Sequence, residues 1–255
     1  MEIVADARIV VWEGASLWIV DATSGAADRR TDPHAHHAIQ VTISLGGWFT
    51  LATDGPEMRQ DIVAVAADAR HIYGAEGLTA FLFIEPESRL GRAVARQLFD
   101  GGDLTAIPLA RLGDFRDRAI AAWRNPVRDD ATLIALGRAA VAALAGETRA
   151  DIPDYRVRRM IAWAAQQVDG PVSLADAVAV GGLSASRLRH LFVEQTGLPF
   201  KTYLLWLRLT RAVEVVAAGA SITQAAHDSG FADSAHLSRT FRRMFGIAPA
   251  ALRIT

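Results

Sequence analysis

Apolar positions recur at helical spacing in the last third of the chain. Within residues 221–249, small apolar residues precede Gly230, and large apolar residues four positions apart follow it. These large residues are Leu237, Phe241 and Phe245. Gly readily adopts the positive φ that ends a helix, and the Asp233 side chain can cap a second helix by accepting from a backbone N–H. The pattern predicts two short helices joined by a Gly turn.

A second copy of this pattern lies upstream, in residues 173–199. Ser173 and Asp176 have the spacing of a capping box, and Ser184 can cap the second helix of this copy. The turn, stripe and end residues of the copy are Gly182, Leu183, Leu188, Phe192, Gly197 and Pro199. Such self-similarity predicts a repeated supersecondary unit, with residues 200–219 as one connecting helix. A rigid connector would let both second helices enter successive major-groove segments of DNA, roughly 34 Å apart.

The second helix of the downstream copy is basic and polar on its outer face, which taken alone also fits an ordinary helical hairpin with a solvated surface. The stretch GFADSAHLSRTFRRMFGIAP, at residues 230–249, resembles the signature of the AraC/XylS-type transcription regulators nearly residue for residue. Arg208 and Leu209 with Ala212 are similar to the connecting-helix pattern of that family. The resemblance extends from about Val157 to Arg253 and implies a DNA-binding domain of two helix-turn-helix units.

Short apolar runs separated by turn residues occupy residues 9–84, which predicts strands. The expected strands are Ile9–Trp12, Ser16–Asp21, Ile39–Leu45, Trp48–Ala52, Ile62–Ala66 and Ala80–Ile84. Gly46 and Gly47 suit a hairpin between the third and fourth strands, and residues 53–56 suit another turn. Many short strands with tight turns predict a sandwich or barrel. The family resemblance implies, more specifically, a cupin-like jelly-roll domain that senses a small-molecule effector.

Between residues 90 and 147 the apolar spacing becomes helical. These helices can complete the core of the strand domain, or they can form the homodimer interface that the family resemblance implies. Residues 146–153 have the composition of a linker. We therefore expect a two-domain α+β chain, with a cupin-like barrel at 1–90, a helical dimerisation region at 91–150 and a DNA-binding domain at 151–255. Its helix-turn-helix motifs span 173–197 and 221–246.

Composition and charge narrow the possible functions. The chain has no Cys, which excludes disulfides, thiolate metal sites and a cysteine nucleophile. It has no apolar run of membrane-spanning length and no secretory signal pattern at its start, so we expect a cytoplasmic protein with no membrane partner. The net charge of -1 hides an asymmetry: residues 152–255 carry 12 basic and 7 acidic side chains, whereas residues 1–151 carry 15 and 21. A basic C-terminal domain favours phosphate binding.

The outer faces of the two second helices supply candidate DNA contacts. The family pattern implies base contacts from Ser186, Arg189, His190, Ser234, Ala235, Ser238 and Arg239. Arg can form two hydrogen bonds with a guanine edge, whereas short side chains contribute little beyond contact with thymine methyl groups. Phosphate contacts position a protein without reading sequence. We expect them from Ser184, Arg187, Arg208, Arg211, Arg242 and Arg243.

Histidines cluster ahead of two of the expected strands. His34 and His36 point to one side of an extended chain because the strand period is two; Gln40 shares their parity, and His37 faces away. His34, His36, Gln40 and His71 resemble the ligand positions of cupin metal sites, with Gln where Glu is usual. Losing that anionic ligand should weaken divalent metal binding, so we expect no metal cofactor, although a bound metal stays open as an alternative. The residues can also line a small-molecule pocket.

The motifs of catalysis are missing from the sequence, which has no Gly-rich phosphate loop and no GxSxG elbow. The sequence therefore predicts a DNA-binding transcription regulator and not an enzyme. Its expected partners are double-stranded DNA, a small-molecule effector and a second copy of the chain. The alternative is a metal-dependent cupin enzyme fused to a DNA-binding domain.

Overall fold

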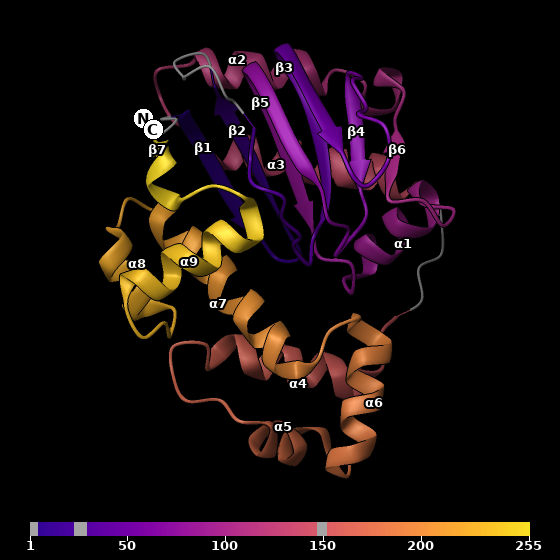
Figure 1. Cartoon of the computed structure of the whole chain (residues 1–255), viewed down its shortest axis with the longest axis vertical. Coiled ribbons are helices and arrows are strands. Elements are labelled where there is room, and N and C mark those ends of the chain that lie inside the picture. Colours follow the sequence, from indigo (N-terminus) through magenta and orange to yellow (C-terminus); the bar gives the residue numbers. More distant parts are fainter. Residues whose placement is uncertain (1–4, 23–29, 147–151) are drawn as a thin grey trace. The chain divides into compact units, whose positions relative to one another are not determined.

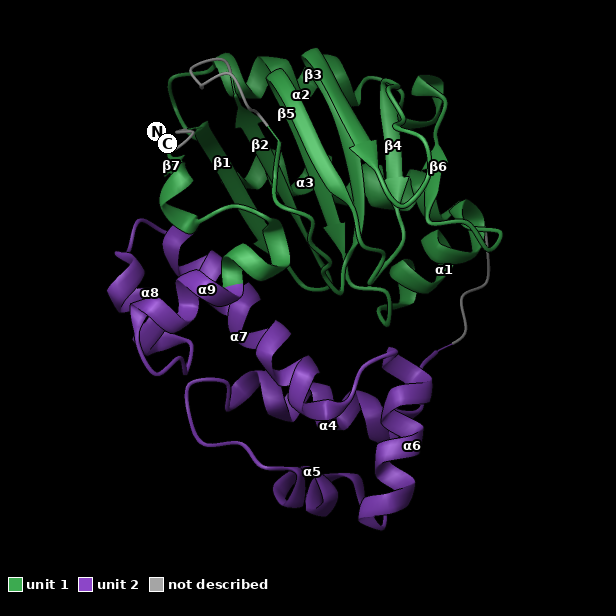
Figure 2. Cartoon of the chain, in the orientation of Figure 1, with its two compact units in different colours: residues 1–150, 241–255 green, residues 151–240 purple. Residues whose placement is uncertain are grey.

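The computed structural model describes residues 5–22, 30–146 and 152–255. The chain divides into two compact units (Figure 2). The first unit comprises residues 1–150 together with 241–255, and the second comprises residues 151–240. A sheet with helices forms the first unit, and helices alone form the second (Figure 1). The two-domain α+β prediction is confirmed, but the last fifteen residues group with the first unit and not with the expected DNA-binding domain.

The sheet of the first unit has the strand order β6-β4-β3-β5-β2-β1-β7. Its strands are β1 (Ala5–Trp12), β2 (Ala15–Asp21), β3 (Ile39–Ala52), β4 (Ile62–Val65), β5 (Ile72–Ile84), β6 (Leu104–Ala106) and β7 (Leu252–Ile254). Neighbouring strands are antiparallel except β1 and β7, which are parallel. The described strands therefore form one sheet, in which β6 and β7 are the first and last strands of the order.

The expected hairpin at Gly46 and Gly47 is wrong, because β3 runs through both residues and pairs with β5 on either side of them. The register shifts between Ser44 and Gly46, which marks a β-bulge. Gly47 has φ 131° and pairs with Gly77, and a Cβ on Gly47 would lie 2.0 Å from the backbone oxygen of Glu76. The glycines permit a close approach of two strands at a bulge, which a local sequence pattern does not distinguish from a turn.

The helices of the first unit complete the core of the sheet. They are α1 (Arg89–Leu98), α2 (Phe115–Arg124) and α3 (Asp130–Ala145), with short 3-10 turns η1 (Leu109–Leu112) and η2 (Pro249–Ala251). Leu133, Leu136 and Leu144 of α3 share one buried cluster with Ile39 and Leu82 of the sheet. The core-completing alternative for this region is therefore confirmed, and a dimer interface on the outer helix faces stays a prediction.

The second unit consists of helices, of which α4 to α7 surround a core of their own. The helices are α4 (Tyr155–Gln166), α5 (Leu174–Gly181), α6 (Ala185–Thr196), α7 (Phe200–Ala217), α8 (Ile222–Asp228) and α9 (Ser234–Phe245). Met160, Ala177, Leu188, Phe192 and Tyr203 form the centre of its core. The last five residues of α9 group with the first unit. Residues 147–151 of the expected linker lie outside the described residues.

Among the helices that the structure describes, none combines the length and the apolar character that crossing a lipid bilayer requires.

Candidate nucleic-acid interface and effector site

The caps of the first helix-turn-helix unit are those that its sequence predicts. The Ser173 hydroxyl accepts from the Asp176 backbone N–H at 3.2 Å, and the Asp176 carboxylate accepts from the Ser173 N–H at 3.1 Å. Gly182 then takes a left-handed conformation with φ 64°, which ends α5. Ser184 caps α6 by accepting from the Arg187 N–H. These capping interactions fix the turn between the two helices, and with it the direction in which α6 leaves the turn.

α6 separates its buried and exposed side chains as a recognition helix requires. Leu188 and Phe192 are buried in the core of the second unit. The opposite face is exposed and carries Ser184, Ser186, Arg187, Arg189 and His190. All predicted DNA contacts of the first helix-turn-helix unit therefore lie on its solvent side.

The second helix-turn-helix unit is also capped as expected. Ser221 accepts from the Gln224 N–H at 3.1 Å, which begins α8. Gly230, with φ 70°, follows the end of α8, and a Cβ there would lie 2.4 Å from the backbone oxygen of Val168. The Asp233 carboxylate accepts from the His236 N–H at 2.6 Å and begins α9. The turn thus requires Gly both for its backbone conformation and for space.

The predicted base contacts on α9 differ in their exposure. Ala235 and Arg239 are exposed, whereas Ser234 and Ser238 are half-buried. The Ser238 hydroxyl donates to the backbone oxygen of Ser234 at 2.8 Å, so its hydrogen already has a partner within the helix. Arg239 is therefore the predicted reader on α9 whose side chain is best placed for a base edge.

The connecting helix α7 carries two of the predicted phosphate contacts, which differ in their exposure and in their hydrogen-bond partners. Arg208 donates to the backbone oxygens of Val168, at 3.1 Å, and Gly170, at 2.9 Å. Burial lowers the pKa of its guanidinium. Arg211 is exposed and pairs with Glu214 one turn away at 2.6 Å. Arg208 thus holds the chain that follows α4 in place, which removes it from our set of phosphate contacts.

The end of α9 packs in the first unit. Phe241 stacks on Trp18 with ring centroids 6.4 Å apart, and Phe245 contacts both Trp18, at 5.1 Å, and Phe83, at 5.4 Å. Arg242 pairs with Asp32 at 2.8 Å. The helical spacing of the two phenylalanines predicts a place in the core of the helical domain, but Trp18 of β2 and Phe83 of β5 are among their partners.

The chain after α9 continues along the same unit. The backbone oxygen of Gly246 accepts from the Asp32 N–H at 2.9 Å, and β7 pairs with β1. Arg253 pairs with Asp6 across this strand pair. Without residues 241–255, residues 151–240 carry 9 basic and 8 acidic side chains, so the second unit is far less basic than the expected 151–255 domain.

The predicted histidine cluster is assembled in the first unit. His34, His36 and His71 are buried, and their ring centroids lie 4.2–5.9 Å apart. His34 and His71 exchange backbone hydrogen bonds at 3.0 and 2.9 Å, which joins two segments distant in sequence. The Gln40 side chain lies 3.0 Å from Nε2 of His36. The structure therefore brings together all four residues that the sequence singles out.

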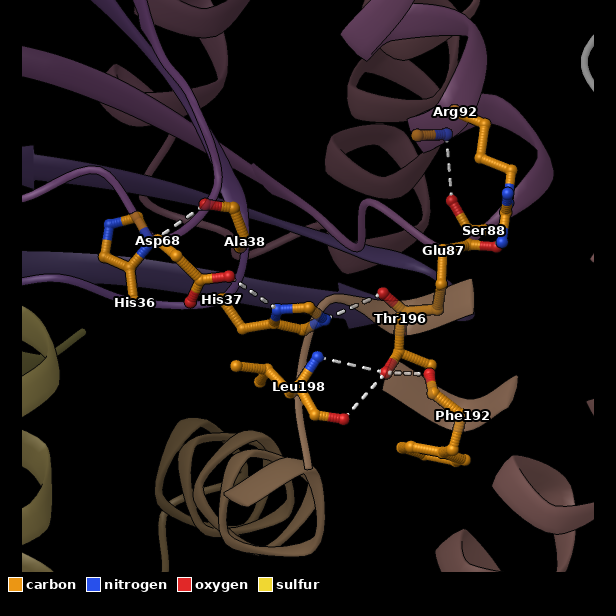
Figure 3. Close-up of polar contacts among 11 residues, drawn as sticks. His36, His37, Ala38, Asp68, Glu87, Ser88, Arg92, Phe192, Thr196 and Leu198 are labelled. Atoms are coloured by element: carbon orange, nitrogen blue, oxygen red, sulfur yellow. Dashed lines mark hydrogen bonds and ion pairs between the residues drawn. The ribbon is translucent and has the colours of Figure 1, made fainter. Parts of the chain in front are cut away.

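His37 points away from this cluster, as its parity predicts, toward the carboxylates of the buried Glu87 and the exposed Asp68 (Figure 3). Its Nε2 lies 3.0 Å from the Glu87 carboxylate, and its Nδ1 lies 3.4 Å from that of Asp68. Burial disfavours the charged ring, but these two hydrogen bonds raise the pKa of His37 to about 9. Sequence reasoning missed both partners, because they lie 31 and 50 residues away and carry no local signal.

A mostly apolar cavity of about 100 Å³ lies beside the histidine cluster. Trp18, Tyr73, Phe81 and Phe83, four of the aromatic residues of the N-terminal half, line it together with His34, Gln40 and Arg30. Phe245, Ile247, Ala251 and Leu252 complete the wall from the other end of the sequence. The cavity is smaller than the ~150 Å³ that holds a benzene molecule in a protein core.

Comparison with known proteins supports the helical unit most strongly. Residues 177–254 match a family model described as a helix-turn-helix domain. The chain is 38% identical over 104 residues to the HTH-type transcriptional activator RhaS of Escherichia fergusonii, a match that covers 39% of this chain and 36% of RhaS. The chain thus spans about a third of the length of the curated relatives it matches.

Solved structures extend the likeness to the whole fold. ToxT from Vibrio cholerae O395 superposes with a TM-score of 0.60 at 12% identity, covering 95% of this chain and 96% of ToxT. ToxT from strain SCE256, solved with a bound unsaturated fatty acid, superposes with a TM-score of 0.56 at 14% identity, covering 93% and 94%. At this identity the likeness shows the fold alone. The helix-turn-helix family match, the identity to RhaS and the two capped helix-turn-helix units on one connecting helix support the resemblance of the C-terminal part of this chain to the AraC/XylS-type regulators.

Proposed function

We propose that the chain is a DNA-binding transcription regulator whose first unit senses a small molecule. The observation that carries the proposal is α6, which buries Leu188 and Phe192 and presents Ser186, Arg189 and His190 to solvent. The name of RhaS, a transcriptional activator, supports the same activity for this chain. No catalytic step forms part of the proposal.

DNA reading in this proposal uses both recognition helices. α7 has 18 residues, which corresponds to a length of about 27 Å. This is close to one turn of DNA, so α6 and the start of α9 suit successive major-groove segments roughly 34 Å apart. Arg189 and Arg239 would each pair with a guanine edge. Ser184, Arg187, Arg211 and Arg243 would contact phosphates and set the register.

Selection of bound duplexes from a random pool tests the DNA-binding proposal. We expect enrichment of sites with two recognition elements one helical turn apart. The matched variant Arg189→Ala should lose preference at one base pair of one element only, because α9 still reads the other. Recovery of no enriched sequence by the full chain, with or without candidate effectors, would contradict sequence-specific binding.

The effector proposed for the cavity is a largely apolar molecule with one acidic group. Four aromatic side chains line the cavity, and Arg30 lies at its edge, paired with Glu57 at 2.6 Å. The fatty acid bound to ToxT has this chemistry, an apolar body with a carboxylate. A carboxylate from the ligand would replace Glu57 beside Arg30 and form the charge-assisted pair that guanidinium groups favour.

Signal transmission in this proposal follows from the cavity wall. A molecule larger than the cavity of about 100 Å³ must displace part of the lining. Phe245, which lines the cavity, is also the last residue of α9. An effector that displaces Phe245 would therefore change how the end of α9 is held, and with it the DNA affinity of the second helix-turn-helix unit.

Thermal unfolding with an unsaturated fatty acid and with the corresponding alcohol tests the effector class. We expect the acid to raise the unfolding temperature of the full chain more than the alcohol, and Arg30→Gln to remove the difference. Equal effects of acid and alcohol on the wild type would exclude the carboxylate pairing.

A homodimer and a cytoplasmic location complete the proposal. The family resemblance supports both. Sedimentation of the full chain with and without a selected duplex tests the dimer. A single chain on the duplex at saturating protein would contradict it.

A further inference from the structure

The C-terminal segment of the first unit forms part of the wall of the effector cavity. Ile247, Ala251 and Leu252 line the cavity from this segment, whereas β2 and β5 supply its aromatic lining. From Leu252 onward the segment continues as β7, which pairs with β1 at one edge of the sheet (Figure 1). We call residues 246–255 the C-terminal strap. The cavity wall therefore has a sheet part and a strap part.

These two parts of the wall differ in how many strand pairs hold them. All seven residues of β2 pair with β1 on one side and with β5 on the other. β7 has three residues, and among the described strands only β1 pairs with them. Local opening of a structure needs less free energy where fewer hydrogen bonds and buried contacts are lost. The strap is therefore the part of the wall that can move while the sheet stays folded.

Two polar side-chain contacts of the strap lie at the protein surface. Arg253, whose side chain is 67% exposed, donates to both carboxylate oxygens of Asp6. The Arg128 guanidinium lies 3.5 Å from the backbone oxygen of Thr255, which in turn donates its N–H to the Ala7 oxygen at 3.0 Å. Exposed ion pairs contribute little stability, because water and salt screen them. These contacts orient the strap on β1 without attaching it strongly.

Gly246 is the residue at which the strap leaves α9. Its φ of 71° is one that other residues rarely adopt, and its backbone oxygen accepts from the Asp32 N–H at 2.9 Å. A Cβ on Gly246 would lie 2.5 Å from the backbone oxygen of Asp32 and 2.6 Å from Nδ1 of His34. Gly lets the chain turn and pass this close to its neighbours, so the closed position of the strap depends on this residue.

We propose that the C-terminal strap is a gate, which opens away from β1 by rotation at Gly246 and admits the effector to the cavity. The cavity of about 100 Å³ is smaller than an apolar acid, so the ligand must displace part of the lining. The strap is the part whose displacement breaks the fewest strand pairs. The identity of the ligand rests on the proposed function, whereas the opening of the strap is a property of the chain by itself.

The reactivity of a single thiol tests whether the strap opens on its own. The chain has no Cys, so Ala251→Cys places its only thiol in the strap, at a buried position. Ala80→Cys is the matched control, because Ala80 is also buried but lies in β5. Without denaturant, Ala251→Cys should react with a maleimide about 100-fold faster than Ala80→Cys, since its exposure does not require the sheet to unfold. Gly246→Ala, which strains the closed position, should raise the rate for Ala251→Cys alone.

A disulfide between the strap and β1 tests whether this opening admits the ligand. Asp6 and Arg253 are partners in the β1–β7 register, and the spacing of about 4.8 Å between neighbouring strands suits a disulfide. Oxidised Asp6→Cys/Arg253→Cys should associate with a fluorescent unsaturated fatty acid about 100-fold more slowly than the same protein after reduction. Recovery on reduction rules out a damaged fold as the cause. The control Asp6→Cys/Asp21→Cys joins β1 to β2 and should bind at equal rates in both states.

The outcomes separate the gate from the effector class. Equal association rates of oxidised and reduced Asp6→Cys/Arg253→Cys would overturn entry through the strap. Fatty-acid binding by a chain in which Ala251→Cys reacts no faster than Ala80→Cys, or does not respond to Gly246→Ala, would overturn the gate and leave the effector class standing. Fast reaction of Ala251→Cys without fatty-acid binding in any form would overturn the effector class and the admission of this ligand, while the opening of the strap stands.

Discussion

The two recognition helices share a sequence pattern, but their apolar faces pack in different places. α6 buries Leu188 and Phe192 in the core of the second unit. α9 places Phe241 and Phe245 against Trp18 of the first unit. A repeated motif thus predicts two similar helices without predicting what covers their apolar stripes, because any apolar surface of matching shape can do so.

This difference suggests that the two helices have different roles in regulated DNA binding. The first buries its apolar stripe within its own unit. The second ends beside the effector cavity, where Phe245 is both the last residue of the helix and part of the cavity wall. Regulation by an effector would therefore act mainly through α9, and α6 would supply a constant share of the DNA affinity.

Replacing the matched phenylalanines gives the largest expected effects. Phe192→Ala and Phe245→Ala should each destabilise the unit that holds the side chain by about 3–5 kcal/mol. Phe192→Ala should also abolish DNA binding, because α6 depends on that core. Phe245→Ala should leave DNA binding intact or strengthen it, because it releases the end of α9. Thermal unfolding measures the stability of each variant, and gel-shift titration measures its DNA affinity. An equal loss of DNA binding in the two variants would contradict different roles for the two helices.

The pH dependence of stability should also separate the two units. Burial, reinforced by Glu87 and Glu13 and opposed by His37, raises the pKa of Glu85 from 4.5 to about 8. The folded chain then holds a proton that the unfolded chain has released, so Glu85 contributes stability to the first unit that is lost as pH rises from about 4.5 to about 8. The slope is at most about 1.4 kcal/mol per pH unit.

Glu85→Gln should remove this contribution, so the stability of the variant relative to the wild type should rise as pH rises from about 4.5 to about 8, while the second unit is unchanged. Urea unfolding at a series of pH values, followed separately by near-ultraviolet circular dichroism and by DNA binding, measures the two units. A constant difference in stability between Glu85→Gln and the wild type over this pH range would contradict the raised pKa of Glu85.

Replacing each of the two arginines of α7 should have smaller effects, which distinguish a structural role from a DNA-binding role within the second unit. Arg208→Ala should lower its stability by about 1.5–3 kcal/mol, because two backbone oxygens lose a charged donor. Arg211→Ala removes an exposed pair and should leave stability nearly unchanged, while weakening binding to any duplex. Thermal unfolding distinguishes them. Equal stability of both variants would return Arg208 to the set of phosphate contacts.

The smallest expected effect is at the surface pair that holds the end of α9. Asp32→Asn removes the charge partner of Arg242, and exposed pairs of this kind contribute about 0.2–1 kcal/mol. The released Arg242 becomes available to a phosphate, so DNA affinity should rise slightly. Gel-shift titration at low salt is the suitable measurement, and a fall in affinity would contradict a role for this pair in restraining the helix.

Local signals in the sequence predict most of the helical unit. Ser173, Ser184 and Asp233 act as caps as expected, because capping depends on residues within three positions of one another. The alternation of His34, His36 and Gln40 likewise predicts their shared side. The structural features that the sequence does not predict depend on contacts between residues far apart in the sequence. The register shift between Ser44 and Gly46 arises only in the pairing with β5, where Gly77 lies opposite Gly47, and a three-residue strand such as β7 has too few residues for a pattern.

The same reasoning explains the error at the end of α9. Its apolar spacing correctly predicts a helix with a buried stripe, but spacing contains no information about which surface does the burying. The aromatic residues Trp18 and Phe83 were recognisable in the sequence only as general core candidates. Their contact with Phe245 joins the two ends of the chain, and no local pattern records such a contact.

The central claim is that α9 reads bases, and a salt-dependent titration of two arginine variants tests it most directly. Arg239→Ala and Arg243→Ala are measured on a selected duplex and on a scrambled one over several salt concentrations. Arg239→Ala should cost about 1–3 kcal/mol on the selected duplex and relax the preference at one base pair. Arg243→Ala should weaken both duplexes by similar factors and lower the salt slope by about one ion. Equal weakening of both duplexes by Arg239→Ala would contradict base reading by α9. Unchanged DNA affinity in both variants would favour the alternative that this unit is an ordinary helical hairpin with a solvated surface.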